Sequence, residues 1–321
     1  PPPPAEPDLG LISASRHSGW AKVRARTYAA MLALDLSPNR LRRFAQCGTQ
    51  TFVMGHVNPV GTAPAGAAAH YDALRMHTNR CRDRFCVPCA TERARVVAQT
   101  LVRLLDGQPA RFLTLTLAHS DAPLRSQIDR LYDCYKRLRR KPLWTTSVRA
   151  AAAILEVKRN KADDAWHPHF HILAKGRFLP HADLKAEWHA ITGDSYIVDI
   201  RYIRNEANAV AYVAKYAGKA MNQTYSTSAD ALAEAIEALH HRRTLLLTGE
   251  WHGLGVDREK DPRTWVFVAD LATLLHRVCD GDADAAAILR RLSKGETRCR
   301  KRRTRSRSER PPPPAAQSAL N

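Results

Sequence analysis

Three histidines stand at every second position in the segment WHPHFHILAK, residues 166–175: His167, His169 and His171. In a β-strand, alternate side chains point to the same face, so this spacing gathers three imidazoles on one side of a sheet. An isoleucine and a leucine follow directly, which is typical of a strand that enters a core. A single histidine in such a strand is usually structural, whereas three in register favour metal binding or phosphate chemistry.

A second apolar segment, AAAILEVKRN at 151–160, precedes the histidines and is joined to them by a polar turn around KADDA. The two segments are expected to form an antiparallel hairpin, in which opposed residue numbers sum to 325 or to 327, depending on where the turn is centred. The first register places Glu156 opposite His169, and the second places it opposite His171. Both registers gather a carboxylate and two imidazoles on one face, while a slip of one residue would separate them.

Two imidazoles and one carboxylate with open coordination positions suit a divalent ion such as Mg²⁺ or Mn²⁺ that also holds a phosphate. The candidate ligands are therefore Glu156, His169 and His171. The alternative for Glu156 is an ordinary exposed strand position. His167 is less secure as a ligand, because Pro168 can bend the start of the strand.

Three cysteines fall within nine residues in CRDRFCVPC: Cys81, Cys86 and Cys89. The Cys-x2-Cys spacing is that of a zinc site, and Cys47, next to a glycine, is the candidate fourth thiol of a closed structural Zn²⁺ site. Two histidines compete for that fourth position, His56 and His77. Because the first residues lack the pattern of a signal peptide, we expect a reducing cytoplasm, where clustered thiols indicate metal rather than disulfides.

The chain carries an excess of positive charge, with 50 Lys and Arg against 31 Asp and Glu and a formal net charge of +19. Such an excess indicates a polyanionic partner, most simply nucleic acid. Residues 290–310 are the densest basic segment and read as a disordered tail that adds salt-sensitive affinity for phosphates. Its candidate DNA-binding residues are Arg298, Arg300, Lys301, Arg302, Arg303 and Arg305.

Strand and helix patterns alternate along the chain, which predicts an α+β protein with a central antiparallel sheet flanked by helices. Strands are expected at 111–118, 151–160, 167–175 and 195–203, and helices at 92–106, 123–140, 181–193, 205–221 and 265–280. The expected parts are an N-terminal tail at 1–40, a loop-rich zinc-binding module at 41–92, a nuclease domain at 93–225, a C-terminal helical region at 226–290 and a basic disordered tail at 291–321. No run of about 18 apolar residues is present, so no membrane span is expected.

The segment YVAKYAGK at 212–219 places Tyr212, Tyr216 and Lys219 on one face of the expected helix. Tyrosines at this spacing are usually core residues. Beside a metal site, however, a phenol activated by a nearby cation or base can attack phosphorus, and a lysine one turn on can stabilise the phosphate charge.

Three segments appear in the order of the three motifs of HUH endonucleases: FLTLTLA, the HFH of WHPHFHILA, and AYVAKYAGK. The chain most resembles the rolling-circle replication initiators of small plasmids. The segments LEVKRN and CRDRFCVPC and the tryptophan ahead of ITGDSYIVDIR, Trp188, support this resemblance. It covers residues 45–220 and implies the HUH endonuclease fold.

The resemblance implies roles for particular residues. His169 and His171 correspond to the metal-binding pair, and Glu156 to the upstream carboxylate. Tyr216 corresponds to the nucleophile that becomes joined to a 5′-phosphate at the nick in single-stranded or hairpin origin DNA. Some relatives carry a glutamate four residues before the tyrosine, where this chain has Tyr212; in this it is similar to two-tyrosine phage initiators, so Tyr212 is either a second nucleophile or a packing residue.

Two alternatives remain open from the sequence. One is an HUH transposase of an insertion element, and the other is a zinc-containing DNA-binding regulator without catalysis. A relaxase is less well supported, because its tyrosine usually precedes the histidines. The P-loop pattern GxxxxGK[ST] is absent from the sequence, so no nucleotide cofactor is expected and a host helicase and DNA polymerase would have to act with the chain.

Overall fold

A computed structural model describes residues 14–57, 67–160, 164–203, 228–256 and 261–294 of the chain. The chain divides into two compact units, one of residues 1–50 and 78–262 and the other of residues 51–77 and 263–321. None of the described helices is both long and apolar enough to cross a membrane.

The first unit is built on a five-stranded sheet with the strand order β6-β3-β5-β4-β7. Every neighbouring pair in this sheet is antiparallel. Its strands are β3 (Ala110–Thr116), β4 (Val148–Arg159), β5 (Trp166–Gly176), β6 (Val198–Ile203) and β7 (Leu245–Gly249). Its helices are α1 (Ala14–Ala33), α2 (Pro38–Ala45), α3 (Val87–Leu105), α4 (Leu124–Leu138), α5 (Pro142–Ser147), α6 (His181–Thr192) and α8 (Ala229–Ala238).

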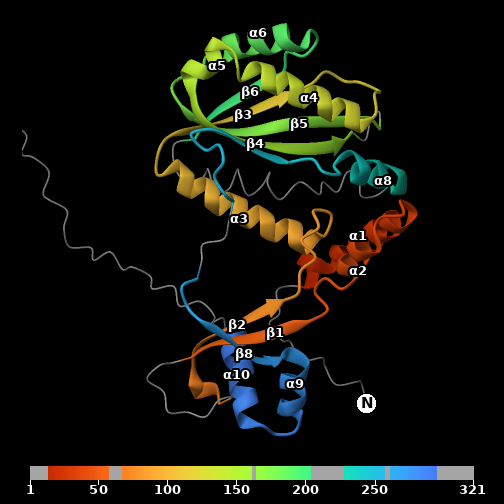
Figure 1. Cartoon of the computed structure of the whole chain (residues 1–321), viewed down its shortest axis with the longest axis vertical. Helices are drawn as coiled ribbons and strands as arrows, with labels where there is room; N and C mark the ends of the chain where they lie inside the picture. The colour runs from red at the N-terminus through yellow and green to blue at the C-terminus, as the bar shows by residue number, and fades with distance from the viewer. Residues whose placement is uncertain (1–13, 58–66, 161–163, 204–227, 257–260, 295–321) are drawn as a thin grey trace, which may run out of the picture. The chain divides into compact units, whose positions relative to one another are not determined.

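Helices cover both faces of this sheet (Figure 1). Apolar residues of α3 pack on one face against Phe112 and Leu173, while α4, α6 and α8 pack on the other face around Phe170 and Ile172. Alternate residues of each strand therefore enter different cores. The inner strand β4 is buried on both faces and carries four consecutive alanines, Ala150–Ala153, although alanine is depleted in strands.

The hairpin of β4 and β5 adopts the first of the two expected registers. Glu156 lies opposite His169, and Arg159 lies opposite Trp166. Near the turn, the backbone N–H of Asn160 donates to the carbonyl of Ala165 at 2.9 Å. The expected hairpin and its pairing are therefore confirmed.

The second unit has a three-stranded sheet with the order β2-β1-β8. Its elements are β1 (Thr51–Val57), the 3₁₀ helix η1 (Ala68–His70), β2 (Tyr71–Thr78), β8 (Trp265–Asp270), α9 (Leu271–Cys279) and α10 (Ala283–Ser293). Packed between these elements is a separate apolar core that includes Val53, Leu74, Leu274 and Ile288.

Two regions contain helices and strands that differ from those expected from the sequence. Residues 41–90 are not mainly loops, because they contain α2, β1 and β2, and β1 pairs with β8 from the far end of the sequence. The prediction of a single helix at 265–280 is wrong. Its first six residues form β8, and the helix begins after Asp270, whose side chain accepts a hydrogen bond from the backbone N–H of Thr273 and caps it.

The region 226–290 is likewise not purely helical. It supplies β7, which pairs with β4 in the sheet of the first unit, and β8 in the second. The five-stranded sheet therefore extends beyond the expected nuclease boundary at residue 225.

Candidate metal centre and cysteine cluster

Glu156 and two histidines of β5 converge at one end of the five-stranded sheet. Oε2 of Glu156 lies 3.0 Å from Nε2 of His169 and 2.6 Å from Nε2 of His171. The two Nε2 atoms are 3.1 Å apart. All three side chains are nearly fully buried. The antiparallel register of β4 and β5 and the two-residue period of a strand together produce this arrangement.

Neighbouring groups fix the orientation of both imidazoles. Nδ1 of His169 lies 3.0 Å from the carbonyl oxygen of His167, so the proton of a neutral ring is at Nδ1. Nδ1 of His171 lies 3.3 Å from the hydroxyl of Thr114 on β3, and the ring of Phe112 stacks on the same imidazole at 5.4 Å. Such contacts at Nδ1 are how metal-binding histidines are usually held with Nε2 toward the ion.

This arrangement requires a positive charge between the three side chains. With its proton at Nδ1, His169 presents a lone pair at Nε2, and the carboxylate of Glu156 presents another at 3.0 Å. Two acceptors at this distance are mutually repulsive unless a proton or a metal ion lies between them. The residues present therefore fit a bound cation.

The protonation states also suit metal binding. Burial acts to raise the pKa of Glu156, but the contacts with the imidazoles of His169 and His171 outweigh it and hold this pKa well below its usual range. Burial lowers the pKa of His171 to about 4. A charged carboxylate and a neutral imidazole at neutral pH are the states in which these groups bind metal ions.

The spacing of the donor atoms favours a six-coordinate ion. In an octahedron with bonds of about 2.1 Å, adjacent donors lie about 3.0 Å apart. The three separations of 2.6, 3.0 and 3.1 Å are close to this value, so Glu156, His169 and His171 would fit around such an ion and would supply two imidazoles and one carboxylate as ligands.

A groove of about 490 Å³ lies next to this centre, at the hairpin end of β4 and β5. Nζ of Lys158, which lines the groove, is 3.7 Å from Oε2 of Glu156. The guanidinium of Arg159 lies over the ring of Trp166 at 5.2 Å. The other lining residues are His119, Asn160, Ala165 and His167. A groove with cations and an aromatic ring beside a metal centre suits a phosphodiester chain.

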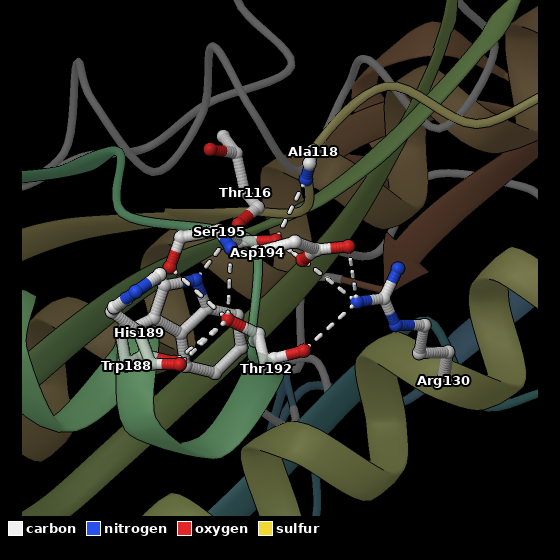
Figure 2. Close-up of polar contacts among 8 residues, drawn as sticks. All are labelled: Thr116, Ala118, Arg130, Trp188, His189, Thr192, Asp194 and Ser195. Atoms are coloured by element: carbon white, nitrogen blue, oxygen red, sulfur yellow. Dashed lines mark hydrogen bonds and ion pairs between the residues drawn. The ribbon is translucent and has the colours of Figure 1, made fainter.

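A polar network holds the end of β3 next to the centre (Figure 2). Nε1 of Trp188 donates to the carbonyl of Thr116 at 2.8 Å, and the backbone N–H of Ala118 donates to the hydroxyl of Ser195 at 2.7 Å. That hydroxyl in turn donates to Asp194, which is paired with Arg130 of α4 at 2.7 Å. Because Thr116 pairs with His169 in the sheet, this network supports the strand beside the metal centre.

Four buried thiols form a second cluster: Cys47, Cys81, Cys86 and Cys89. Sulfur–sulfur distances of 3.6 Å separate Cys47 from Cys89, Cys81 from Cys89, and Cys86 from Cys47. A disulfide needs about 2.05 Å, so these thiols are not paired covalently. Four thiolates around zinc, with bonds of about 2.3 Å, would place the sulfurs about 3.8 Å apart, and the cluster fits such a site.

Among the four thiols, Cys89 lies where a thiolate is favoured, whereas contacts with neighbouring thiols and burial raise the pKa of Cys81, and the pKa of Cys86 is also raised. Cys86 is the N-cap of α3, and Cys89 lies in its first turn. Hydrogen bonds from Cys81 and Cys86 hold the pKa of the Cys89 thiol below its usual value. The positive end of the helix dipole acts in the same direction.

The structure brings together the predicted ligands of both centres. Cys47 occupies the fourth position of the thiol cluster, while its rival His56 is paired with Asp72 in the second unit. The predicted catalytic residues Tyr212, Tyr216 and Lys219 lie outside the described residues. So do the basic residues predicted to bind DNA, Arg298, Arg300, Lys301, Arg302, Arg303 and Arg305.

Two residues beside the centre, Thr114 and Lys158, were not predicted from the sequence. Both carried a usable signal. Thr114 lies in FLTLTLA on a strand expected beside the histidines, and Lys158 shares a strand face with Glu156 because it follows two residues later.

Comparison with known proteins agrees with the expected family. The Rep_1 model, described as a replication protein, matches residues 73–263. A Rep protein of Staphylococcus aureus is 30% identical over 161 residues, which are 44% of this chain and 70% of the relative.

Two Rep proteins from Bacillus also match. One from a Bacillus species is 28% identical over 143 residues, and one from Bacillus amyloliquefaciens is 26% identical over 140 residues. These matches cover 40% and 39% of this chain, and the aligned part spans 47% and 41% of the respective relatives.

No solved structure matches the chain. The HUH endonuclease fold therefore stays a prediction, whereas the α+β class with antiparallel sheets flanked by helices is confirmed. The Rep_1 match includes Glu156, His169, His171 and three of the four clustered cysteines, and it spans more than half of the 321 residues. The chain belongs to the Rep_1 family of replication proteins.

Proposed function

We propose that this chain initiates rolling-circle replication of plasmid DNA by nicking and rejoining a single strand at the origin. The observation that carries the proposal is the buried convergence of Glu156, His169 and His171 in a member of a replication protein family. A regulator that only binds DNA has no need for this donor set with open coordination positions. The family match favours replication over transposition.

The proposed metal centre acts on the scissile phosphate. A bound Mg²⁺ or Mn²⁺ would polarise a phosphate oxygen and stabilise the charge that develops during strand transfer. Glu156, His169 and His171 would hold the ion, with Thr114 and the carbonyl of His167 orienting the two imidazoles. Lys158 adds positive charge at the rim of the groove where the strand would lie.

The proposed nucleophile is Tyr216. Its phenol gives up its proton, the phenolic oxygen forms a bond to the scissile phosphorus, and the bond from phosphorus to the 3′-oxygen breaks. The leaving oxygen takes a proton and becomes a free 3′-hydroxyl, while the 5′-phosphate stays joined to the tyrosine. Attack by a 3′-hydroxyl on this phosphotyrosine reverses the step and rejoins the strand. Lys219 is proposed to stabilise the phosphate, and Tyr212 to serve as a second nucleophile.

The proposed partners follow from this chemistry. The substrate is single-stranded or hairpin origin DNA, and the basic segment at Arg298–Arg305 is proposed to add affinity for its phosphates. The 3′-hydroxyl would prime synthesis by a host polymerase, with a host helicase unwinding the duplex. The cysteine cluster is proposed to hold one structural Zn²⁺.

The proposal is tested by cleavage of labelled single-stranded oligonucleotides that tile the replicon of origin. Wild type, Tyr216→Phe and Tyr212→Phe are incubated with Mn²⁺ or with EDTA, and covalent protein–DNA bands are resolved on denaturing gels. We expect a metal-dependent adduct that is lost in Tyr216→Phe. An adduct remaining in that variant and lost on further substitution of Tyr212 would assign a second nucleophile, while full nicking by the doubly substituted chain would refute the mechanism.

A further inference from the structure

A second basic pocket lies at the opposite end of the five-stranded sheet from the metal centre. It has a volume of about 360 Å³ and is lined by Gln108, Pro109, Arg149, Lys175, Gly176 and Arg177. Three of these six residues are cations and none is an acid. Along β5, Lys175 lies six positions after His169, so the pocket is about 20 Å from the metal centre.

The backbone creates this concentration of charge. Gly176 has a φ of +151°, and a Cβ at this position would lie 2.1 Å from the carbonyl oxygen of Ser147. Only glycine allows the end of β5 to approach the start of β4 so closely. The backbone N–H of Arg177 then donates to the carbonyl of Ser147 at 2.7 Å, which brings Arg177 beside Arg149.

Most of the positive charge in the pocket is uncompensated. Arg149 is paired with Glu250 at 2.6 Å, but both side chains are largely exposed, and such surface pairs are weak. Among the described residues, neither Lys175 nor Arg177 forms an ion pair. Like charges held together this way repel one another, and a bound anion would relieve the repulsion.

The next residue in the chain points to the class of ligand. Phe178 follows Arg177 and is 75% exposed. Cations that hold phosphates, together with an exposed aromatic ring on which a base can stack, are the features of sites for single-stranded nucleic acid. A free phosphate ion would pair with the cations but has no base that could stack on the ring of Phe178.

We propose that this pocket binds backbone phosphates of the single DNA strand at a distance of several nucleotides from the nick, with Phe178 stacking on a base. The inference rests on the proposed function and extends it, because it assigns a second contact of the same substrate. At the stacked rise of 3.4 Å per nucleotide, about 20 Å corresponds to roughly six nucleotides.

The test measures the binding of fluorescein-labelled dT20 to the full chain by fluorescence anisotropy. It is done at several NaCl concentrations without added Mg²⁺ or Mn²⁺. The double variant Lys175→Ala/Arg177→Ala is expected to bind about tenfold more weakly at 0.1 M NaCl. Its slope of log affinity against log salt should fall by about 1.4, as expected when two phosphate contacts of a single strand are lost. Phe178→Ala should weaken binding and leave the slope unchanged.

Matched variants separate this site from general electrostatics. Lys22 and Arg26 are exposed cations of α1 that do not line the pocket, so Lys22→Ala/Arg26→Ala removes the same charge elsewhere and should bind like wild type. Lys175→Arg/Arg177→Lys should retain affinity. An equal loss in both alanine double variants would overturn the inference, as would wild-type binding by Lys175→Ala/Arg177→Ala.

Two further arms distinguish the other possible outcomes. Inorganic phosphate that binds wild type but not the variant, with dT20 affinity unchanged, would assign the pocket to the free ion and refute a DNA site. Metal-dependent adduct formation is measured on the same proteins. A wild type that forms no adduct, while its dT20 binding still depends on Lys175 and Arg177, would refute nicking and leave the pocket in place.

Discussion

Glu156 of β4 lies directly opposite His169 of β5, with its carboxylate oxygen 3.0 Å from Nε2 of that histidine. The same oxygen is 2.6 Å from Nε2 of His171, so one carboxylate contacts both imidazoles. The pairing register of a single hairpin thus assembles all three proposed ligands. A slip by one residue would turn Glu156 to the other face of the sheet and abolish the centre.

Glu156→Gln should abolish tight binding of Mn²⁺ while keeping the shape of the side chain. We expect the dissociation constant to rise by more than about 100-fold, because loss of a supporting residue outside the ligand set alone typically costs 10–100-fold. The measurement is titration of the full chain with Mn²⁺ by calorimetry or electron paramagnetic resonance. The control is Glu187→Gln, which removes a carboxylate of α6 that is paired with Lys141. It should leave the dissociation constant for Mn²⁺ unchanged. Equal Mn²⁺ affinity in wild type and Glu156→Gln would refute the assignment of this ligand.

Thr114→Val should weaken Mn²⁺ binding by about tenfold through His171. The hydroxyl lies 3.3 Å from Nδ1 of this imidazole, and its loss frees the ring to turn. Valine has nearly the same shape, so the fold should be retained. Thr114→Ser restores the hydroxyl and should recover most of the affinity. If serine and valine behave alike in the same titration, the hydroxyl does not orient the ring.

The hairpin was predictable because both its faces and its turn are encoded locally. The two-residue period of the histidines and the position of Glu156 restrict the pairing to registers that unite the three ligands. The sequence left two such registers open, since a shift of two residues moves no side chain to the other face. The structure adopts the one that pairs Glu156 with His169.

Features that depend on distant parts of the chain were less accessible. Cys47 joins three cysteines that lie more than thirty residues further on, and spacing alone could not separate it from His56 or His77. The strands β7 and β8 follow a long region without a clear pattern, and each pairs with a strand about 100 or more residues away. In β8 the apolar run reads equally well as a helix until its pairing with β1 is known.

Cys89→Ser should lower the zinc content of the purified chain from about one equivalent to a small fraction. Removing one of four thiolates opens a closed tetrahedral site and leaves the other three buried thiols without their shared cation. The zinc content is measured by inductively coupled plasma mass spectrometry after extensive dialysis of the protein. Cys279→Ser removes an exposed cysteine of α9 and should retain full zinc. A wild type that is folded and free of zinc would contradict the proposed structural site.

Tyr135→Phe should change how stability depends on alkaline pH. Tyr135 packs against Phe170 behind the histidine strand, and burial raises its pKa from 10.0 to about 12. Between these values the unfolded chain releases the phenolic proton and the folded chain keeps it, so stability is full below pH 10 and declines as pH rises toward 12. Across this window, the free energy of unfolding of wild type should fall by up to about 1.4 kcal/mol per pH unit more than that of Tyr135→Phe. Urea unfolding of both proteins at pH 9, 10 and 11 measures this difference. If the free energy of unfolding falls in parallel with pH in wild type and in Tyr135→Phe, the pKa of Tyr135 is not raised.

Trp188→Phe should destabilise the sheet beside the metal centre. The indole is fully buried and donates to the carbonyl of Thr116, so phenylalanine leaves both a small cavity and an acceptor without its donor. We expect a loss of about 2–3 kcal/mol in the free energy of unfolding, measured by urea titration. Ser195→Ala removes the acceptor for the N–H of Ala118 and should cost about 1–2 kcal/mol. Ile197→Ala, at a side chain 65% exposed on the same segment, should stay within about 0.5 kcal/mol of wild type. Should all three variants unfold alike, the network of Figure 2 would not be what holds the end of β3.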